Sequence, residues 1–231
     1  MHLPMAAKQT LQMQSVIADR SSAHPFSSNP EILIEELKDW CATENNGVAV
    51  SYFFRQIALF VTAQFSLIHQ HGGYFKTPPE NLRYGRMNNY GLPLISFHVD
   101  SDDFVEIPAE KRSEAFRYVL IGQTNALLDQ LRRHANISPI TCWENVLGSL
   151  AWYYATLQQQ HPRTVAEDID WLMDDQNWEP LRKSQWRNFI GTTPLERAVS
   201  GPMRKTCCLY KELPAFGTCT FCRSPIKKSS G

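Results

Sequence analysis

The sequence predicts a mainly helical α+β protein with a small antiparallel β element and a C-terminal loop region stapled by a metal. Apolar residues recur at helical spacing over several long segments, and capping residues precede them. One short apolar segment, residues 94–99, is instead bounded by turn-forming residues, which is typical of a strand. Four of the six cysteines fall between residues 207 and 222, where glycine and proline interrupt the helical pattern.

The composition excludes several classes of protein. With 23 basic and 23 acidic side chains in 231 residues, the chain lacks the basic excess of a nucleic-acid binder. Its 43% of apolar residues argues against a disordered or collagen-like chain, and its length fits one sizeable domain. The most apolar stretch, residues 47–68, carries Arg55, Gln56 and Gln64, so we expect no transmembrane segment.

The N-terminal part of the chain predicts an arm followed by two helices. Residues 1–28 show no lasting periodicity, which indicates a loosely ordered arm. Asn29 and Pro30 supply a cap and a first turn for a helix that runs to about Thr43. A longer and mostly buried helix is predicted over residues 48–69, ending at a pair of glycines.

The middle of the chain predicts the β element and three more helices. Prolines and asparagines over residues 74–93 indicate a loop with at most one short strand. The strand over residues 94–99 ends at an acidic turn, and residues 104–107 are expected to pair back onto it. Helices are then predicted over residues 110–135, 139–160 and 164–175.

These patterns divide the chain into three parts. A loosely ordered arm covers residues 1–28, a mainly helical domain covers 29–200, and a metal-binding segment covers 201–231. The last segment has too few apolar residues to build a packed core of its own. A metal that organises the loop would supply the missing stability.

The C-terminal cysteines have the spacing C-C-x10-C-x2-C and are the candidate metal ligands: Cys207, Cys208, Cys219 and Cys222. Residues 1–14 lack the apolar core of an export signal, so we expect the thiols to stay reduced, and clustered reduced thiols usually bind metal. The C-x2-C half is a common chelate, whereas an adjacent pair needs a bent backbone to direct both sulfurs to one site. The spacing alone favours a [2Fe–2S] cluster and leaves open a structural zinc ion or a thiol switch.

Several other polar residues and cysteines are expected to have structural roles. His69 and His71 lie at a helix end, where histidine can interact with the helix dipole. Asn145 is expected to make a buried hydrogen bond or to line a pocket. Cys41 and Cys142 lie on predicted helices and are expected to be small buried apolar side chains.

The cysteine segment, residues 204–222, resembles the C-terminal signature of the FhuF-like siderophore-iron reductase (ferric iron reductase) family. Ile140–Asn145, continuing to Ala151–Tyr153, is similar to the Trp-x-Asn helix of that family, and Phe54–Ala58 is similar to its buried N-terminal helix. The resemblance implies that the four clustered cysteines ligate a [2Fe–2S] cluster. Arg204 and Lys205 directly precede these ligands, so they either favour the reduced, more negative cluster or are solvated loop charges.

The resemblance also implies an activity, a location and partners. It implies a cytoplasmic reductase, at most peripheral to the inner membrane, that passes one electron to Fe(III) in a hydroxamate siderophore and so releases Fe(II). The sequence has no nucleotide or flavin fingerprint, so we expect an external electron donor such as a ferredoxin, a flavodoxin or a flavin reductase. Two alternatives remain: a zinc-stapled binding module without enzymatic activity, and a thiol-based redox sensor.

Overall fold

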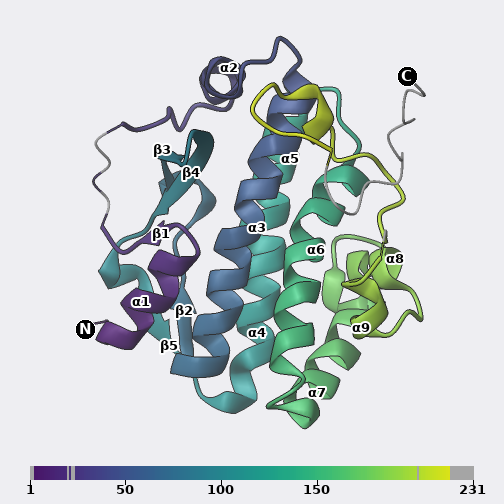
Figure 1. Ribbon diagram of the computed structural model, residues 1–231. Coiled ribbons are helices and arrows are strands. Elements are labelled where there is room, and N and C mark those ends of the chain that lie inside the picture. The colour runs from purple at the N-terminus through teal and green to yellow at the C-terminus, as the bar shows by residue number, and fades with distance from the viewer. Residues whose placement is uncertain (1–2, 20, 22–23, 202, 219–231) are drawn as a thin grey trace.

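The computed structural model describes residues 3–19, 21, 24–201 and 203–218. Helices dominate it and two small sheets accompany them, which confirms the α+β, mainly helical class (Figure 1). The long helix α3 runs through the middle of the molecule (Figure 1). The strands lie on one side of this helix, and α6 to α9 lie on the other.

Helix α3 spans Asn46–His71 and confirms the buried helix predicted over residues 48–69. The Asn45 side chain accepts from two backbone N–H groups at its start, and Gly72 ends it with a φ of +61°. By length and composition alone α3 could cross a membrane, but 89% of its most apolar window is buried inside the fold. This burial is the pattern of a core helix.

The other predicted helices are present, with one change in the middle of the chain. The predicted helix over residues 110–135 is divided into three segments, of which the central one is a π-helix, whose wider turn shifts the faces of the helix. From residue 30 onward, the α-helices other than α3, together with the π-helix, are α2 (Pro30–Cys41), α4 (Arg112–Arg117), the π-helix (Tyr118–Asn125), α5 (Ala126–Arg132), α6 (Pro139–Leu157), α7 (Pro162–Met173), α8 (Gln185–Ile190) and α9 (Leu195–Ala198).

The β structure is larger than the sequence predicts. Strand β3 (Arg83–Asn89) forms an antiparallel hairpin with β4 (Leu92–His98), so residues 74–93, predicted as a loop with at most one short strand, contain more β structure in their second half. Tyr90 and Gly91 both have positive φ at the hairpin turn. Strand β3 lies at the edge of its sheet, and its polar residues hide the alternation that would identify a strand.

The last strand has a different partner from the one predicted. Strand β5 (Phe104–Glu106) pairs antiparallel with β2 (Gly73–Phe75), which directly follows α3, and not with β4. The pairing therefore connects two segments about 30 residues apart in sequence. Spacing between turn signals could not predict it, because β2 is only three residues long.

The N-terminal residues pack more closely than the predicted loose arm. Helix α1 (Met5–Met13) buries Ala7 and Leu11, and β1 (Val16–Ile17) pairs parallel with β4. Five apolar side chains of this segment lie in the core: Leu3, Ala7, Leu11, Val16 and Phe26. They follow helical spacing only from Leu3 to Leu11, which is too short a stretch to produce a lasting sequence pattern. Contact with the rest of the fold orders it.

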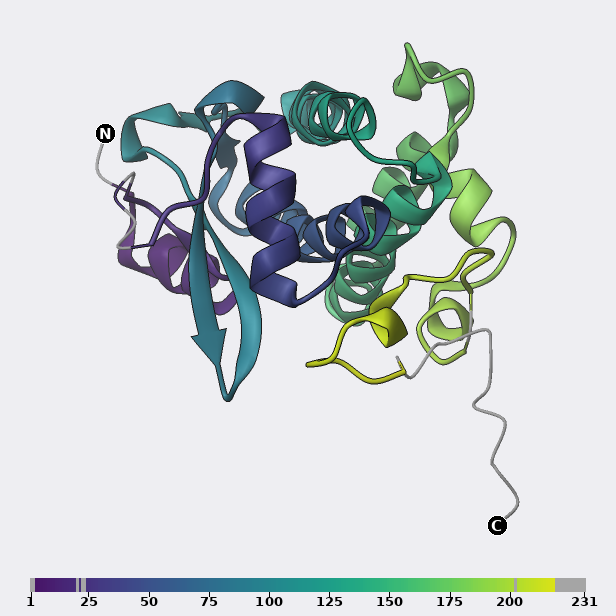
Figure 2. The same ribbon diagram turned by 90° about the horizontal axis from the view of Figure 1, so that it is seen from above.

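The C-terminal segment, residues 203–218, lies across the N-terminal ends of α3 and α6 (Figures 1 and 2). It contains one short 3₁₀ turn over Tyr210–Glu212. Leu213 is buried against the helices, and hydrogen bonds with Ser51 and Glu144 hold the backbone around the cysteine pair. The first cysteine pair of the predicted metal site is therefore attached to the helical core.

Candidate functional site

The adjacent cysteines Cys207 and Cys208 lie in a sharp bend of the C-terminal segment. Leu209 follows them with a φ of +61°, and the 3₁₀ turn begins at the next residue. The Leu209 N–H donates to Cys207 Sγ at 3.4 Å. Cys207 is half-buried, whereas Cys208 is 5% exposed. The bend that an adjacent pair of ligands requires is present, while Cys219 and Cys222 lie outside the described residues.

A buried relay of hydrogen bonds connects Cys208 to the two central helices. The Ser51 hydroxyl of α3 donates to the carbonyl oxygen of Cys208 at 2.8 Å. The Asn145 side-chain amide of α6 donates to Ser51 Oγ at 3.1 Å and to the Ser51 carbonyl at 2.9 Å. Ser51 and Asn145 are both fully buried, so Cys208 is attached to the core through its main chain.

A second attachment precedes the cysteines. Glu144, 2% exposed, accepts from the N–H of Lys205 at 2.7 Å through one carboxylate oxygen. Its other oxygen accepts from the N–H of Thr206 at 3.0 Å and from the Thr206 hydroxyl at 2.5 Å. Arg204 Nε lies 3.9 Å from the same carboxylate. We call Ser51, Glu144 and Asn145 the cysteine clamp.

Aromatic and cationic side chains of this segment pack against α3 or are buried. Tyr210 accepts a hydrogen bond from Gln56 at 3.1 Å, and its ring lies 4.7 Å from that of Phe216. The Arg55 guanidinium lies 5.8 Å from the centre of the Tyr210 ring. Arg204 is only 9% exposed, so describing it as a solvated loop charge is wrong.

The residues around Cys207 and Cys208 fit a [2Fe–2S] cluster. Thiolates are the ligands that such clusters use, and backbone N–H groups that donate to sulfur stabilise them. Cys207 receives such a hydrogen bond, and Arg204, three residues before it, lies against the Glu144 carboxylate. Within the described residues no three metal-ligating side chains gather at one point, so this part of the chain contributes one half of the predicted ligand set.

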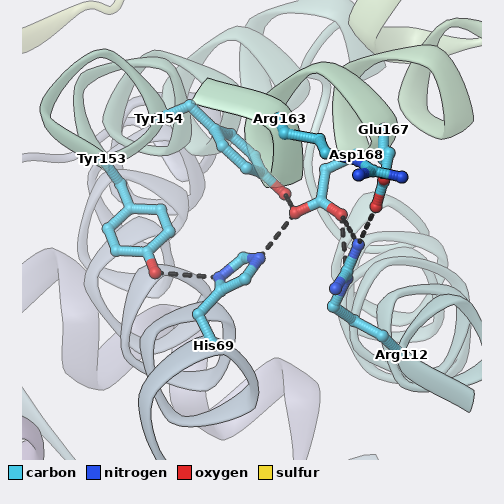
Figure 3. Close-up of polar contacts among 7 residues, drawn as sticks. All are labelled: His69, Arg112, Tyr153, Tyr154, Arg163, Glu167 and Asp168. Carbon is cyan, nitrogen blue, oxygen red and sulfur yellow. Dashed lines mark hydrogen bonds and ion pairs between the residues drawn. The ribbon is translucent and has the colours of Figure 1, made fainter. Parts of the chain in front are cut away.

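A different polar network lies near the other end of α3, and the sequence did not reveal it (Figure 3). His69 Nε2 lies 2.6 Å from an Asp168 carboxylate oxygen, and His69 Nδ1 lies 2.9 Å from the Tyr153 hydroxyl. The Tyr154 hydroxyl donates to the same Asp168 oxygen, and Arg112 binds the other oxygen at 2.9 Å. We call these five residues the His69 network. The one available signal was Asp168, which occupies a core position in the pattern Val165, Asp168, Leu172.

The His69 network connects four helical elements and satisfies its own members. A cavity of about 460 Å³ adjoins it and is lined by His69, Arg112 and the start of α7. Burial raises the pKa of Tyr154 well above its ordinary value, so the phenol stays protonated as a hydrogen-bond donor. The arrangement is that of a structural tie between helices. The expected interaction of His69 with the helix dipole does not account for its position, because Asp168 binds the imidazole ring.

The remaining described cysteines lie in the core, as predicted. Cys41 and Cys142 are 2% and 0% exposed. Burial raises the pKa of both thiols to about 12, because a thiolate would lose its hydration there. These properties are those of small apolar side chains and not of metal ligands.

One family comparison agrees with the resemblance seen in the sequence. The sequence profile described as "Ferric iron reductase FhuF-like transporter" matches residues 57–190, more than half of the chain. No match to a curated protein was found. The matched range contains Glu144, Asn145 and the His69 network, and it ends before the cysteine segment. The chain belongs to the FhuF-like ferric iron reductase family.

Proposed function

We propose that this chain is a [2Fe–2S] ferric-siderophore reductase of the cytoplasm, with Cys207, Cys208, Cys219 and Cys222 as cluster ligands. The observation that carries the proposal is the Cys207–Cys208 bend, which is anchored on the helical core and followed by a C-x2-C pair at the family spacing. Membership of a ferric reductase family supports the same reaction. The proposed substrate is Fe(III) held by a siderophore, of the hydroxamate type.

The proposed reaction is the transfer of a single electron. When bound, the cluster supplies a one-electron carrier. A ferredoxin, a flavodoxin or a flavin reductase gives one electron for each Fe(III) that becomes Fe(II), so the electrons balance. Hydroxamate oxygens are hard ligands that hold Fe(III) more tightly than Fe(II), and the reduced iron then passes to competing ligands.

The residues of the chain contribute binding and electrostatics to this reaction. The four thiolates would hold the cluster, and the Leu209 N–H would donate to the sulfur of Cys207. The cation at Arg204 would favour the more negative, reduced state. Cys207 is the more exposed thiol of the adjacent pair, which suits exchange of electrons with a bulky chelate at the surface.

The first test is the composition of the protein purified without oxygen. We expect broad visible absorption that bleaches with dithionite, together with two irons and two sulfides per chain. Cys207→Ser should remove most of this absorption, whereas Cys142→Ala, a matched change of a core cysteine, should retain it. A colourless protein that binds one zinc, even after reconstitution with iron and sulfide, would contradict the proposal and support a zinc-stapled binding module. Reversible disulfide formation without bound metal would indicate a thiol sensor.

The second test is the reaction with the substrate. Stopped-flow mixing of the reduced protein with ferric hydroxamates should reoxidise it, with one Fe(II) formed for each electron. Ferric catecholate and carboxylate chelates of comparable size test the substrate class. Continuous turnover should require one of the proposed donors. A cluster-loaded protein that none of the ferric chelates oxidises would contradict the reductase assignment.

A further inference from the structure

Two consecutive buried residues of α6 direct their polar groups to the cysteine segment. Glu144 binds Lys205 and Thr206, and Asn145 reaches Cys208 through Ser51. We propose that Glu144 and Asn145 are positioning residues that hold the Cys207–Cys208 pair in its ligand geometry before the cluster binds. We also propose that the buried charge of Glu144 lowers the reduction potential of the cluster. The inference rests on the proposed function.

The bonding of Glu144 is the first argument. A buried carboxylate is costly unless donors surround it. All three hydrogen bonds that the described residues give to this carboxylate come from Lys205 and Thr206, immediately before the first cysteine. Two successive N–H groups directed at one anion fix the course of the backbone at that point. The carboxylate therefore acts on the cysteine segment and not on its own helix.

The position of Asn145 is the second argument. Its amide donates to both polar oxygens of Ser51, and the Ser51 hydroxyl passes the contact to the carbonyl of Cys208. Because each hydroxyl has a single proton, the Asn145 donor fixes the direction in which Ser51 donates. The two attachments lie on either side of Cys207, so the main chain is held both before and after this thiol.

The charge of Glu144 lies next to the residues that precede Cys207. Reduction adds an electron to a cluster that four thiolates already make negative. A buried carboxylate bound to the residues just before Cys207 opposes that addition, since charges in a low-dielectric interior are weakly screened. Arg204, at 3.9 Å from Glu144, offsets part of the effect. Removing the charge of Glu144 while keeping its shape should therefore raise the reduction potential.

Asp168 provides a matched control. It is also a buried carboxylate with several donors, yet it lies in the His69 network near the opposite end of α3. Asp168→Asn and Glu144→Gln both replace a buried carboxylate by an amide. We expect both variants to lose stability, whereas only Glu144→Gln should affect the cysteine segment and the cluster.

The first experiment is hydrogen exchange on the full-length protein without metal. We expect the amides of Lys205 and Thr206 to exchange about tenfold or more faster in Glu144→Ala than in the wild type, because a charge-assisted bond is lost. Thr206→Val, which removes only the hydroxyl donor, should have a smaller effect in the same direction, and Asp168→Asn should leave both amides unchanged. Equal exchange in the wild type and in Glu144→Ala would overturn the positioning role.

The second experiment is a potentiometric titration of the cluster-loaded protein, followed by visible absorption. We expect a more positive potential for Glu144→Gln and an unchanged one for Asp168→Asn. An unchanged or more negative potential in Glu144→Gln would overturn the electrostatic part. If the wild type assembles no cluster, the proposed function fails, and the exchange experiment still decides whether the clamp holds the segment.

Discussion

The cysteine clamp and the His69 network use the same two helices for different purposes. Helices α3 and α6 each contribute to both: Ser51 and His69 lie on α3, and Asn145 and Tyr153 lie on α6. Ser51 and His69 are 18 residues apart, which corresponds to about 27 Å along a helix. The networks are thus spatially separate, although they share a scaffold.

The difference lies in what each network binds. The members of the His69 network bind one another, and each belongs to a helical element, so the product is a rigid junction (Figure 3). In the cysteine clamp, Ser51 and Glu144 bind the backbone of a segment that has little regular structure of its own, and Asn145 holds Ser51. A network that closes on itself stabilises a fold, whereas one that binds a loop orders the loop. Buried polar residues near a family motif are therefore better judged by their partners than by their burial.

The largest expected effect is on the closed network. Asp168→Ala leaves Arg112 and His69 without their shared carboxylate, and removal of one partner from a buried ionic cluster costs about 3–5 kcal/mol of unfolding free energy. Urea denaturation of the full chain measures the loss. The exchange rates of the Lys205 and Thr206 amides should stay unchanged under native conditions. Faster exchange there would show that the two networks are coupled and do not act separately.

The next effect is the pH dependence of the unfolding free energy, to which the buried thiols of the helical core contribute. Burial raises the pKa of Cys41 and Cys142 from 9.0 to about 12, so the unfolded chain loses these protons first. The stability that comes from keeping these two thiols protonated is fully present below about pH 9 and falls as the pH rises toward 12. At about pH 10 the loss amounts to roughly 1.4 kcal/mol per thiol.

Unfolding free energies between about pH 8 and pH 10 check this prediction. Cys142→Ala should reduce the pH dependence by the contribution of one thiol. Iodoacetamide should label Cys207 of the metal-free protein well before Cys41 and Cys142, because the core thiols are buried and remain protonated. Rapid labelling of the core thiols in the folded protein would contradict their assignment.

Removal of one hydroxyl from each network should have a smaller effect on the unfolding free energy. Ser51→Ala removes the donor to the carbonyl of Cys208, and Tyr153→Phe removes the partner of His69 Nδ1. Each should cost about 1 kcal/mol of unfolding free energy, the usual net value of one hydrogen bond. Only Ser51→Ala should also lower the amount of iron and sulfide retained after reconstitution. Equal retention by both variants would argue against a separate role for the clamp.

The smallest effect is expected midway between the networks. Gly148 lies on α6 between Asn145 and Tyr153, and a Cβ there would meet no atom within 4 Å. Gly148→Ala should therefore raise the stability by about 0.5–1 kcal/mol through helix propensity alone. Thermal unfolding measures the gain, and cluster content should not change. A loss of stability would indicate that this stretch of α6 needs a glycine for another contact.

Local signals explain which parts of the fold could be predicted. The caps at Asn29, Ser138 and Gly72 lie next to the helices that they begin or end, so α2, α3 and α6 were predicted to within a few residues. Strand β3 was missed because polar residues fill an edge strand, and the pairing of β5 with β2 was missed because it depends on how α3 positions β2.

The candidate site divides in the same way. The cysteine spacing, the residue types and the likeness to a family can be read from the chain alone, because these are properties of neighbouring residues. That Glu144 and, through Ser51, Asn145 contact the cysteine segment about 60 residues away, and that Asp168 binds His69, follows from folding. A buried polar side chain takes its role from the donors and acceptors that folding brings to it, and no local pattern records them.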